Sequence, residues 1–498
     1  MSANSGVSHK KIAINAISAV VQVVVAGLMY FFLYRYLIEK LGASQLGVWA
    51  LVLSTSSIAS LANFGITSGL VKFVADYKAK GNFADMNKLI FTAFISIIVF
   101  FTVLIVIAYV VVYLIINQIV DKQYIPLALK ILPYSLLCLF INEVGGVFTS
   151  ILEGFQKNYI RNLIYVVATL LFLFISYALV PIYGLAGVAY AQVIQSILIT
   201  VSAVFAGSYL IKGFSVFRWN WDKDIFKSLI SYGSKFQLVS LLQMLYEPAT
   251  KALLTRFGGL PAVGFYEMAT RLVNQVRALI VNANQVMVPV VAEAAYIGQH
   301  EVRKLYIKSM SVTLFINIPL IAAILCFSPF ISYYWIGHYE SNFTFPLSVL
   351  AVAMFFNIMC GPAFFSSLGE GKLNLLVWVN GLMGILNISL GLGLGYLFKG
   401  DGVILSWGIT YAVCSLILIF FYQKSLDVKF KNIFSRSDNI LFFVSIVYTA
   451  LAVIIAARMK NNSVEVLLVN IFVFGLIFMP LLYVNKNFKM LYQKLIKK

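Results

Sequence analysis

Six ionisable side chains fall in two long apolar stretches separated by a short turn at Gly258-Gly259. A charged side chain inside a bilayer costs a few kcal/mol on insertion scales, so it needs a partner or a water-filled cavity. These side chains are therefore the first candidates for binding a charged substrate or ion. The six are Glu247, Lys251 and Arg256 before the turn, and Glu267, Arg271 and Arg277 after it.

Opposite charges in the two stretches are equally distant from the turn. Counted from Gly259, Lys251 and Glu267 are each eight residues away, and Glu247 and Arg271 are each twelve away. If the stretches form a helical hairpin, this spacing predicts Glu247–Arg271 and Lys251–Glu267 ion pairs. Two interpretations stay open: the pairs neutralise the hairpin, or they form a polar cavity wall whose charges are shared with substrate or ion.

The second stretch also carries a polar stripe. At 100° per residue, five of its polar side chains fall within an arc of about 80°. Lipid does not tolerate such a face, so we expect it to line a water-filled cavity. The five are Glu267, Arg271, Asn274, Asn282 and Gln285.

Arg277 lies outside this arc, with no evident partner in the sequence. A guanidinium suits phosphate, so we predict that Arg271 and Arg277 bind phosphate, together with Lys251 and the amides Asn274, Asn282 and Gln285. The alternative is an arginine that extends to the membrane surface or binds backbone carbonyls.

Glu143 is the other carboxyl group near the middle of an apolar stretch, beside Gly145-Gly146. Desolvation would keep it protonated there. It could carry a coupling proton or hydrogen-bond a neighbouring helix, and both interpretations stay open.

The composition indicates a polytopic membrane protein. Hydrophobic residues make up 61% of the 498 residues and charged ones 11%, against roughly 25% charged in soluble domains. Since each span needs about 20 apolar residues, we predict an all-α fold of about fourteen transmembrane helices with short loops. The predicted helices are 13–38, 45–74, 88–117, 130–153, 160–181, 184–209, 228–255, 261–295, 309–335, 345–368, 373–397, 401–423, 438–457 and 464–485.

The chain contains an internal repeat. Two sets of landmarks match at a shift of 217 residues and a third matches at 215, as expected after small loop deletions. Repeated halves are typical of transporters, which bind substrate between two lobes. We predict six-helix lobes 1–211 and 228–424, an interfacial linker 212–227, and a segment 425–498 with two further helices and a basic tail. The matches are Gly42 and Gly47 with Gly259 and Gly264, Glu153-Gly154 with Glu370-Gly371, and Gly187-Val188 with Gly402-Val403.

The net charge of +19 follows the membrane topology. With both termini and the even-numbered loops on one side, 24 Lys and Arg residues lie there against 7 on the other. This asymmetry predicts that both termini are cytoplasmic. The linker and the basic tail would then contact anionic lipids, so we expect no nucleic-acid partner.

Sequence signatures of enzymes and metal sites are missing. The chain has no phosphate-binding loop of the G-x-x-x-x-G-K-[ST] type and no H-E-x-x-H motif. Its three histidines are far apart, and its four cysteines lie within predicted spans. We therefore expect no catalytic residue, metal or cofactor. The short loops also disfavour a membrane enzyme of glycan synthesis.

Residues 41–73 resemble the start of Wzx-type polysaccharide flippases, which belong to the multidrug/oligosaccharidyl-lipid/polysaccharide exporter superfamily. The resemblance rests on the Leu-Gly-x-x-x-x-Gly turn of residues 41–47, on Asn63-Phe64-Gly65 and on Lys72. The Gly-x-x-Gly-x-Ala pattern at residues 184–189 and the two Glu-Gly pairs also resemble this family. Asn63 departs from the Asp often found there, so no role for a charge is carried over to it.

The resemblance implies a flippase of the bacterial inner membrane that moves undecaprenyl-diphosphate-linked oligosaccharide repeat units outward by alternating access. It also implies glycan polymerase machinery as a partner, and H⁺ or Na⁺ as a coupling ion. A lipid II flippase or a multidrug or cation antiporter of the same superfamily would share the fold. The antiporters usually carry a carboxylate in the first helix, whereas residues 13–38 contain no Asp or Glu.

Overall fold

The computed structural model describes residues 9–57, 66–211, 221–285, 287–428, 433, 438–448 and 464–484. These residues form helices and turns without a β-strand, which confirms the predicted all-α fold. The helices are α1 (His9–Ser57), α2 (Ile66–Ala79), α3 (Phe83–Ile119), α4 (Ile125–Gly154), α5 (Asn158–Tyr183), α6 (Leu185–Leu210), α7 (Lys223–Gln285), α8 (Met287–Ile297), α9 (Gln299–Ile336), α10 (Ser341–Gly369), α11 (Leu373–Ser425) and α13 (Val464–Val484).

Eight of the helices in the described part are long and apolar enough to cross a membrane, and a shorter apolar helix covers Asp438–Tyr448. The chain is therefore a polytopic membrane protein. Fourteen crossings remain a prediction. One expected start differs clearly: α9 begins at Gln299 rather than at residue 309, because its first turns are rich in polar residues and give no hydropathy signal.

Three long helices each run from one predicted span into the next through one residue of positive φ. The residue is Gly42 in α1 (φ 77°, ψ 168°), Gly259 in α7 (φ 77°, ψ 172°) and Lys399 in α11 (φ 55°, ψ −135°). Glycine adopts this backbone without the steric cost of a Cβ. The matched glycines 217 residues apart thus make the same turn, and Gly184 (φ 58°, ψ −136°) repeats the turn of Lys399 at a distance of 215.

The two-residue slip of the repeat arises after the Glu-Gly pairs. Helix α5 begins at Asn158, four residues after Gly154, whereas α11 begins at Leu373, two residues after Gly371. A loop shorter by two residues therefore accounts for the change of offset from 217 to 215.

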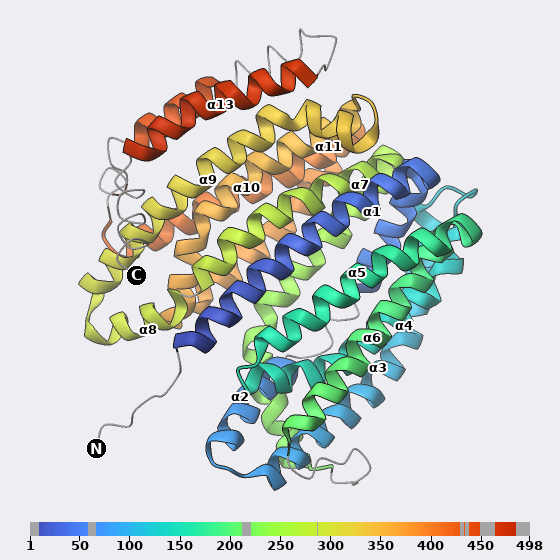
Figure 1. Ribbon diagram of the computed structural model, residues 1–498, viewed down its shortest axis with the longest axis vertical. Coiled ribbons are helices and arrows are strands. Elements are labelled where there is room, and N and C mark those ends of the chain that lie inside the picture. The colour runs from blue at the N-terminus through green and yellow to red at the C-terminus, as the bar shows by residue number, and fades with distance from the viewer. Residues whose placement is uncertain are drawn as a thin grey trace. The chain divides into compact units, whose positions relative to one another are not determined.

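The chain divides into two compact units, Met1–Gly264 and Phe265–Lys498. In the first unit, α3, α4, α5 and α6 run side by side (Figure 1). Its core joins apolar side chains of α2, α3, α4 and α6, among them Leu70, Leu89, Phe148 and Ala203. The boundary lies within α7, and the predicted lobes 1–211 and 228–424 remain predictions.

Helices α4 and α6 approach closely because a glycine lies at their contact. A Cβ built on Gly145 would lie 2.5 Å from Thr200 Oγ1, and this hydroxyl donates to the carbonyl of Ile141 at 3.0 Å. Small residues and hydroxyl groups of this kind hold membrane helices together where the hydrophobic effect is weak.

The turns of the first unit alternate between its two ends. At one end, Lys78 donates to the carbonyl of Phe155 at 3.2 Å, and Lys88 forms a 2.6 Å ion pair with Asp222. At the other end, Tyr36 stacks on Tyr177 with ring centroids 4.1 Å apart. This alternation is what helices crossing a membrane in succession require.

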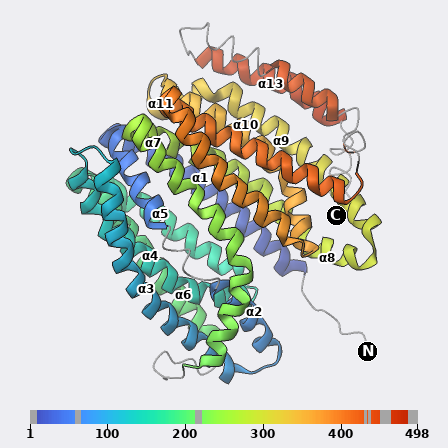
Figure 2. The same ribbon diagram turned by 180° about the vertical axis from the view of Figure 1, so that it is seen from behind.

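In the second unit, α10 packs between α9 and α11, and α13 runs along α9 (Figure 2). Buried aromatic pairs hold these helices. Trp335 of α9 meets Phe343 of α10 edge to face at 5.7 Å, and Tyr306 meets Tyr422 at 5.2 Å. Such pairs are stabilising beyond their burial.

Candidate functional site

Two ion pairs lie on α7, each between residues four apart. Lys251 Nζ is 2.9 Å from Glu247 Oε1, and Arg271 Nε is 2.7 Å from Glu267 Oε1. Residues four apart are neighbours on a helix surface. Each pair brings its helical turn close to electrical neutrality, which lowers the cost of holding buried Lys251 and Glu267 in a membrane.

The pairs predicted across the hairpin, Glu247–Arg271 and Lys251–Glu267, would join residues of the two different units. They remain predictions. Within its own unit, each of these four side chains has an oppositely charged neighbour one turn away.

The predicted polar stripe on α7 changes from buried to exposed along the helix. Glu267 is buried, Arg271 is half-buried and Asn274 is exposed. The side chains of Asn282 and Gln285 lie outside the described residues. The described part thus contains one compensated charge pair followed by an amide that neighbouring side chains do not cover.

Arg277 binds a partner that the sequence did not reveal. Its Nε donates to Oδ1 of Asn357 on α10 at 2.8 Å, and the residue is half-buried. Among the described residues, the guanidinium makes no other hydrogen bond or ion pair. Because the amide of Asn357 is neutral, Arg277 keeps its full positive charge, and the N–H groups of its two terminal nitrogens remain available.

Buried polar residues of α7 and α9 contact each other and α10 near this pair. We call Asn284, Thr313 and Asn317, with the carbonyl of Phe355, the polar seam. Thr313 Oγ1 donates to Asn284 Oδ1 at 3.4 Å, and Asn317 Nδ2 donates to the carbonyl of Phe355 at 2.9 Å. Asn284, Thr313 and Asn317 are all buried. In the described part of the chain, Asn284 Nδ2 and Asn317 Oδ1 have no hydrogen-bond partner. Buried groups of this kind are costly unless water or a ligand satisfies them.

The seam consists of neutral residues, so the pattern of charges in the sequence does not indicate it. A signal was nevertheless present in the helical spacing. Thr313 and Asn317 are four residues apart on α9, and Gly361 follows Asn357 by four on α10. At Gly361 a Cβ would lie 2.9 Å from Asn284 Nδ2, so the glycine makes room for this amide.

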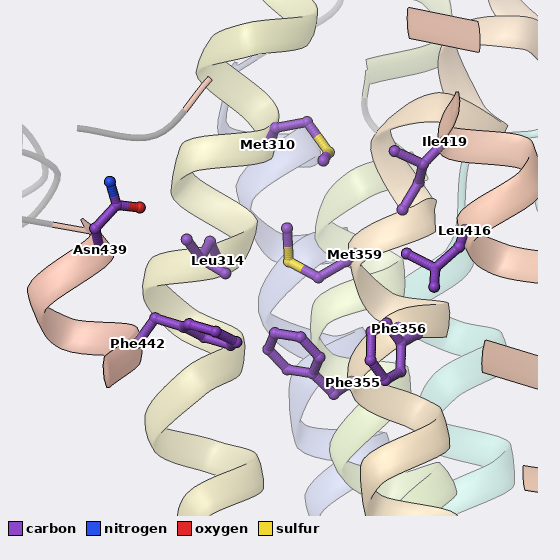
Figure 3. Close-up of a pocket in the computed structure, with 9 residues that line it drawn as sticks. All are labelled: Met310, Leu314, Phe355, Phe356, Met359, Leu416, Ile419, Asn439 and Phe442. Carbon is purple, nitrogen blue, oxygen red and sulfur yellow. The ribbon is translucent and has the colours of Figure 1, made fainter. Parts of the chain in front are cut away.

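An apolar cavity of about 200 Å³ lies beside this part of α10 (Figure 3). Phe355, Phe356 and Met359 line one side and lie within two residues of Asn357 in the chain. The other side chains come from α9, α11 and the helix Asp438–Tyr448. They are Met310, Leu314, Leu416, Ile419, Asn439 and Phe442.

The carboxylates of the two Glu-Gly pairs fasten the turns that follow them. Glu153 forms an ion pair with Arg161. Glu370 is buried at its side chain and accepts hydrogen bonds from Tyr422 at 2.7 Å, Lys372 at 2.8 Å and Gln299 at 3.2 Å. It thereby links the start of α9, the turn after α10 and the end of α11.

Glu143 lies half-buried on α4, two residues before Gly145. Within the described ranges, no group of three or more His, Cys, Asp and Glu side chains could hold a metal ion. The cysteines Cys138, Cys326, Cys360 and Cys414 are all buried.

Comparison with known proteins gives a family match over more than half of the chain. A model of the family described as polysaccharide biosynthesis protein matches residues 40–338. A protein of Shigella flexneri that is named as an O-antigen transporter is 22% identical over 406 residues, covering 79% of this chain and 93% of that protein.

Solved transporter structures share the fold. A lipid II flippase, MurJ, in an inward closed conformation is 14% identical, with a TM-score of 0.72 over 97% of this chain and 100% of that one. An inward-facing multidrug resistance transporter of the MATE family and the MOP superfamily is also 14% identical, with a TM-score of 0.70 over 82% of this chain and 98% of that one.

Proposed function

Because the chain belongs to the polysaccharide biosynthesis protein family, we propose that it is a flippase that moves a polyprenyl-diphosphate-linked oligosaccharide from the cytoplasmic to the outer leaflet of the bacterial inner membrane. A diphosphate bearing sugars cannot enter hydrocarbon without losing its hydration. A path lined by a few polar side chains solvates this headgroup, while the lipid tail stays between the helices. Such a flippase moves its substrate without making or breaking a covalent bond, so it is not an enzyme.

The observation that carries this proposal is the environment of Arg277. It lies half-buried on α7, and its Nε donates to a neutral amide, so no described residue that it bonds cancels its charge. A guanidinium with free terminal N–H groups binds phosphate oxygens in a bidentate manner. A phosphate-bearing headgroup is therefore the ligand class that Arg277 suits best.

The other polar side chains of α7 would act on the same substrate. We assign Arg271 and Lys251 to the phosphates, and Asn274, Asn282 and Gln285 to sugar hydroxyls. Amides both donate and accept hydrogen bonds, which suits hydroxyl groups.

Energy would come from a coupling ion. Glu143 is half-buried on the spanning helix α4. We assign the coupling of H⁺ or Na⁺ to the carboxylates Glu143, Glu247 and Glu267. Alternating access of the two predicted lobes would carry the headgroup across.

The test is complementation of a bacterial strain that lacks its own repeat-unit flippase and supplies the matching glycan. The wild-type chain should restore surface glycan, Arg277→Ala should abolish it and Arg277→Lys should impair it, all at equal protein level in the membrane. Arg256→Ala is the matched control, because Arg256 is an exposed arginine of the same helix. It should leave glycan export unchanged.

Normal surface glycan with Arg277→Ala at native expression would remove Arg277 from the mechanism. A wild-type chain that restores growth after depletion of the lipid II flippase, but exports no repeat units, would identify lipid II as the substrate instead. Changed drug susceptibility without either effect would identify a multidrug antiporter.

A further inference from the structure

We infer that Asn357 is a positioning residue that holds the Arg277 guanidinium ready for phosphate and keeps its charge uncancelled. This inference rests on the proposed function. It concerns the partner on α10 that distinguishes Arg277 from Arg271.

Arg271 and Arg277 differ in the acceptor that their Nε atoms contact. Arg271 Nε donates to the carboxylate of Glu267 at 2.7 Å, whereas Arg277 Nε donates to the amide of Asn357 at 2.8 Å. The two bonds have nearly equal length. The first compensates the positive charge and the second does not, so an anion gains more from Arg277 than from Arg271.

The hydrogen bond through Nε leaves the terminal N–H groups of Arg277 without a partner among the described residues. A guanidinium carries five N–H groups in one plane, and four of them lie on the two terminal nitrogens. Fixing Nε fixes this plane. The terminal groups can then meet two oxygens of one phosphate without first losing the rotational freedom of a flexible side chain.

The turn of α10 that bears Asn357 is itself held in place. The carbonyl of Phe355 accepts from Asn317 Nδ2, a fully buried side chain of α9. The rings of Phe355 and Phe356 line the apolar cavity (Figure 3), and Phe355 stacks on Phe442 at 5.9 Å. Because these contacts hold the turn in place, they also hold Asn357. Its hydrogen bond to Nε in turn holds Arg277.

Substitutions at Asn357 separate this role from packing. Asp is nearly isosteric with Asn and also accepts the Nε bond, but it would cancel the charge of Arg277 and repel a diphosphate. Substitution by Leu removes the hydrogen bond to Arg277 Nε and leaves the arginine's charge uncancelled. Substitution by Gln retains the hydrogen bond and also leaves the charge uncancelled. A positioning role in anion binding therefore orders the affinities as wild type, N357Q, N357L and N357D. A purely structural role makes N357L the weakest.

The experiment measures binding of radiolabelled undecaprenyl diphosphate to the purified full-length protein in phosphatidylcholine nanodiscs. We expect N357D to weaken binding about tenfold and N357L about threefold, because a charge-assisted bond exceeds a neutral one. N117D is the matched control. It makes the same change at an exposed asparagine of α3 and should bind like the wild type.

Binding by N357D within twofold of the wild type, or weaker binding by N357L than by N357D, would overturn the inference. If N357D does not yield a monodisperse protein, N357Q and N357L decide: equal binding by these two overturns the inference as well. Loss of binding in R277A together with normal binding in N357D would overturn the role of Asn357 and leave the proposed function standing. A wild-type protein that does not bind the probe overturns both.

Discussion

Gly47 lies against the main-chain carbonyl of Leu260 so closely that a Cβ on Gly47 would be 1.9 Å from that oxygen. A reciprocal contact exists between Gly264 and the carbonyl of Ala43, where the corresponding distance is 2.3 Å. A shift of 217 residues converts one contact into the other. Each turn thus places its glycine against a main-chain carbonyl of the other turn, at equivalent positions in both directions. Two copies related by a two-fold axis make reciprocal contacts of this kind.

We expect Gly47→Ala and Gly264→Ala to destabilise the protein, because the added methyl group meets rigid backbone rather than a flexible side chain. Overpacking of this kind costs roughly 1–3 kcal/mol. The measurement is the midpoint of thermal unfolding in detergent. Gly393→Ala is the control, since a Cβ there meets nothing within 4 Å. Equal midpoints for all three variants would show that the turns separate without cost.

Glu370→Gln should lower the thermal midpoint, because the amide cannot replace a carboxylate that accepts from Lys372, Tyr422 and Gln299 together. Hydrogen bonds to charged groups contribute about 1.5–3 kcal/mol each. Glu39→Gln, an exposed carboxylate beside Lys40, is the control and should have little effect. If both substitutions have the same effect, Glu370 does not fasten the turns.

Acid should weaken the attachment of the chain at Asp222 to α3. The hydrogen bond from Lys88, with the N–H groups of Ile225 and Asp224, lowers the pKa of Asp222 below its ordinary value. A group whose folded pKa is lowered stabilises the protein above its unfolded pKa of about 3.9, and this stability is lost as pH falls through the folded pKa.

Thermal midpoints of wild type and Asp222→Asn should therefore differ at pH 7 and converge towards pH 3. Asp121→Asn, an exposed carboxylate, provides the control for a lost charge. A difference between wild type and Asp222→Asn that is independent of pH would contradict the assignment.

Charge reversal tests the ion pair of α7. Glu267→Arg and Arg271→Glu should each lower the amount of folded protein, because each leaves like charges four residues apart, one of them buried. The double variant should recover part of the loss. The readout is monodisperse protein by fluorescence-detected gel filtration. A double variant with no more folded protein than its single variants would exclude the pair. The pairings across the hairpin are tested in the same way by two other double variants, Lys251→Glu with Glu267→Lys and Glu247→Arg with Arg271→Glu.

Both termini should be cytoplasmic. Cysteines placed at Ser5 and Tyr492 should react with an impermeant maleimide only after the cells are opened, whereas Tyr339→Cys, at an exposed position of an odd-numbered turn, should react in intact cells. The four native cysteines are buried and give a low background. Labelling at Ser5 or Tyr492 in intact cells would reverse the orientation.

The sequence by itself determined the class of the fold, most helix ends and the repeated turns. Hydropathy decides these features because a spanning helix needs a long apolar run whatever its neighbours are. The turn at Gly42 and its copy at Gly259 were visible for a similar reason, since a positive φ selects glycine locally.

Only the tertiary structure decided which of Arg271 and Arg277 bonds a carboxylate and which bonds a neutral amide. Arg271 and Arg277 look alike in the sequence, and the partner of Arg277 stands 80 residues away on another helix. Asn357 is one neutral residue in an apolar run, and its meaning depends on the rotation of α10 against α7, which side-chain packing over both helices sets. The pattern of one helix contains no information about that rotation, so the neutral partner and the buried seam around it appear only when the helices are packed together.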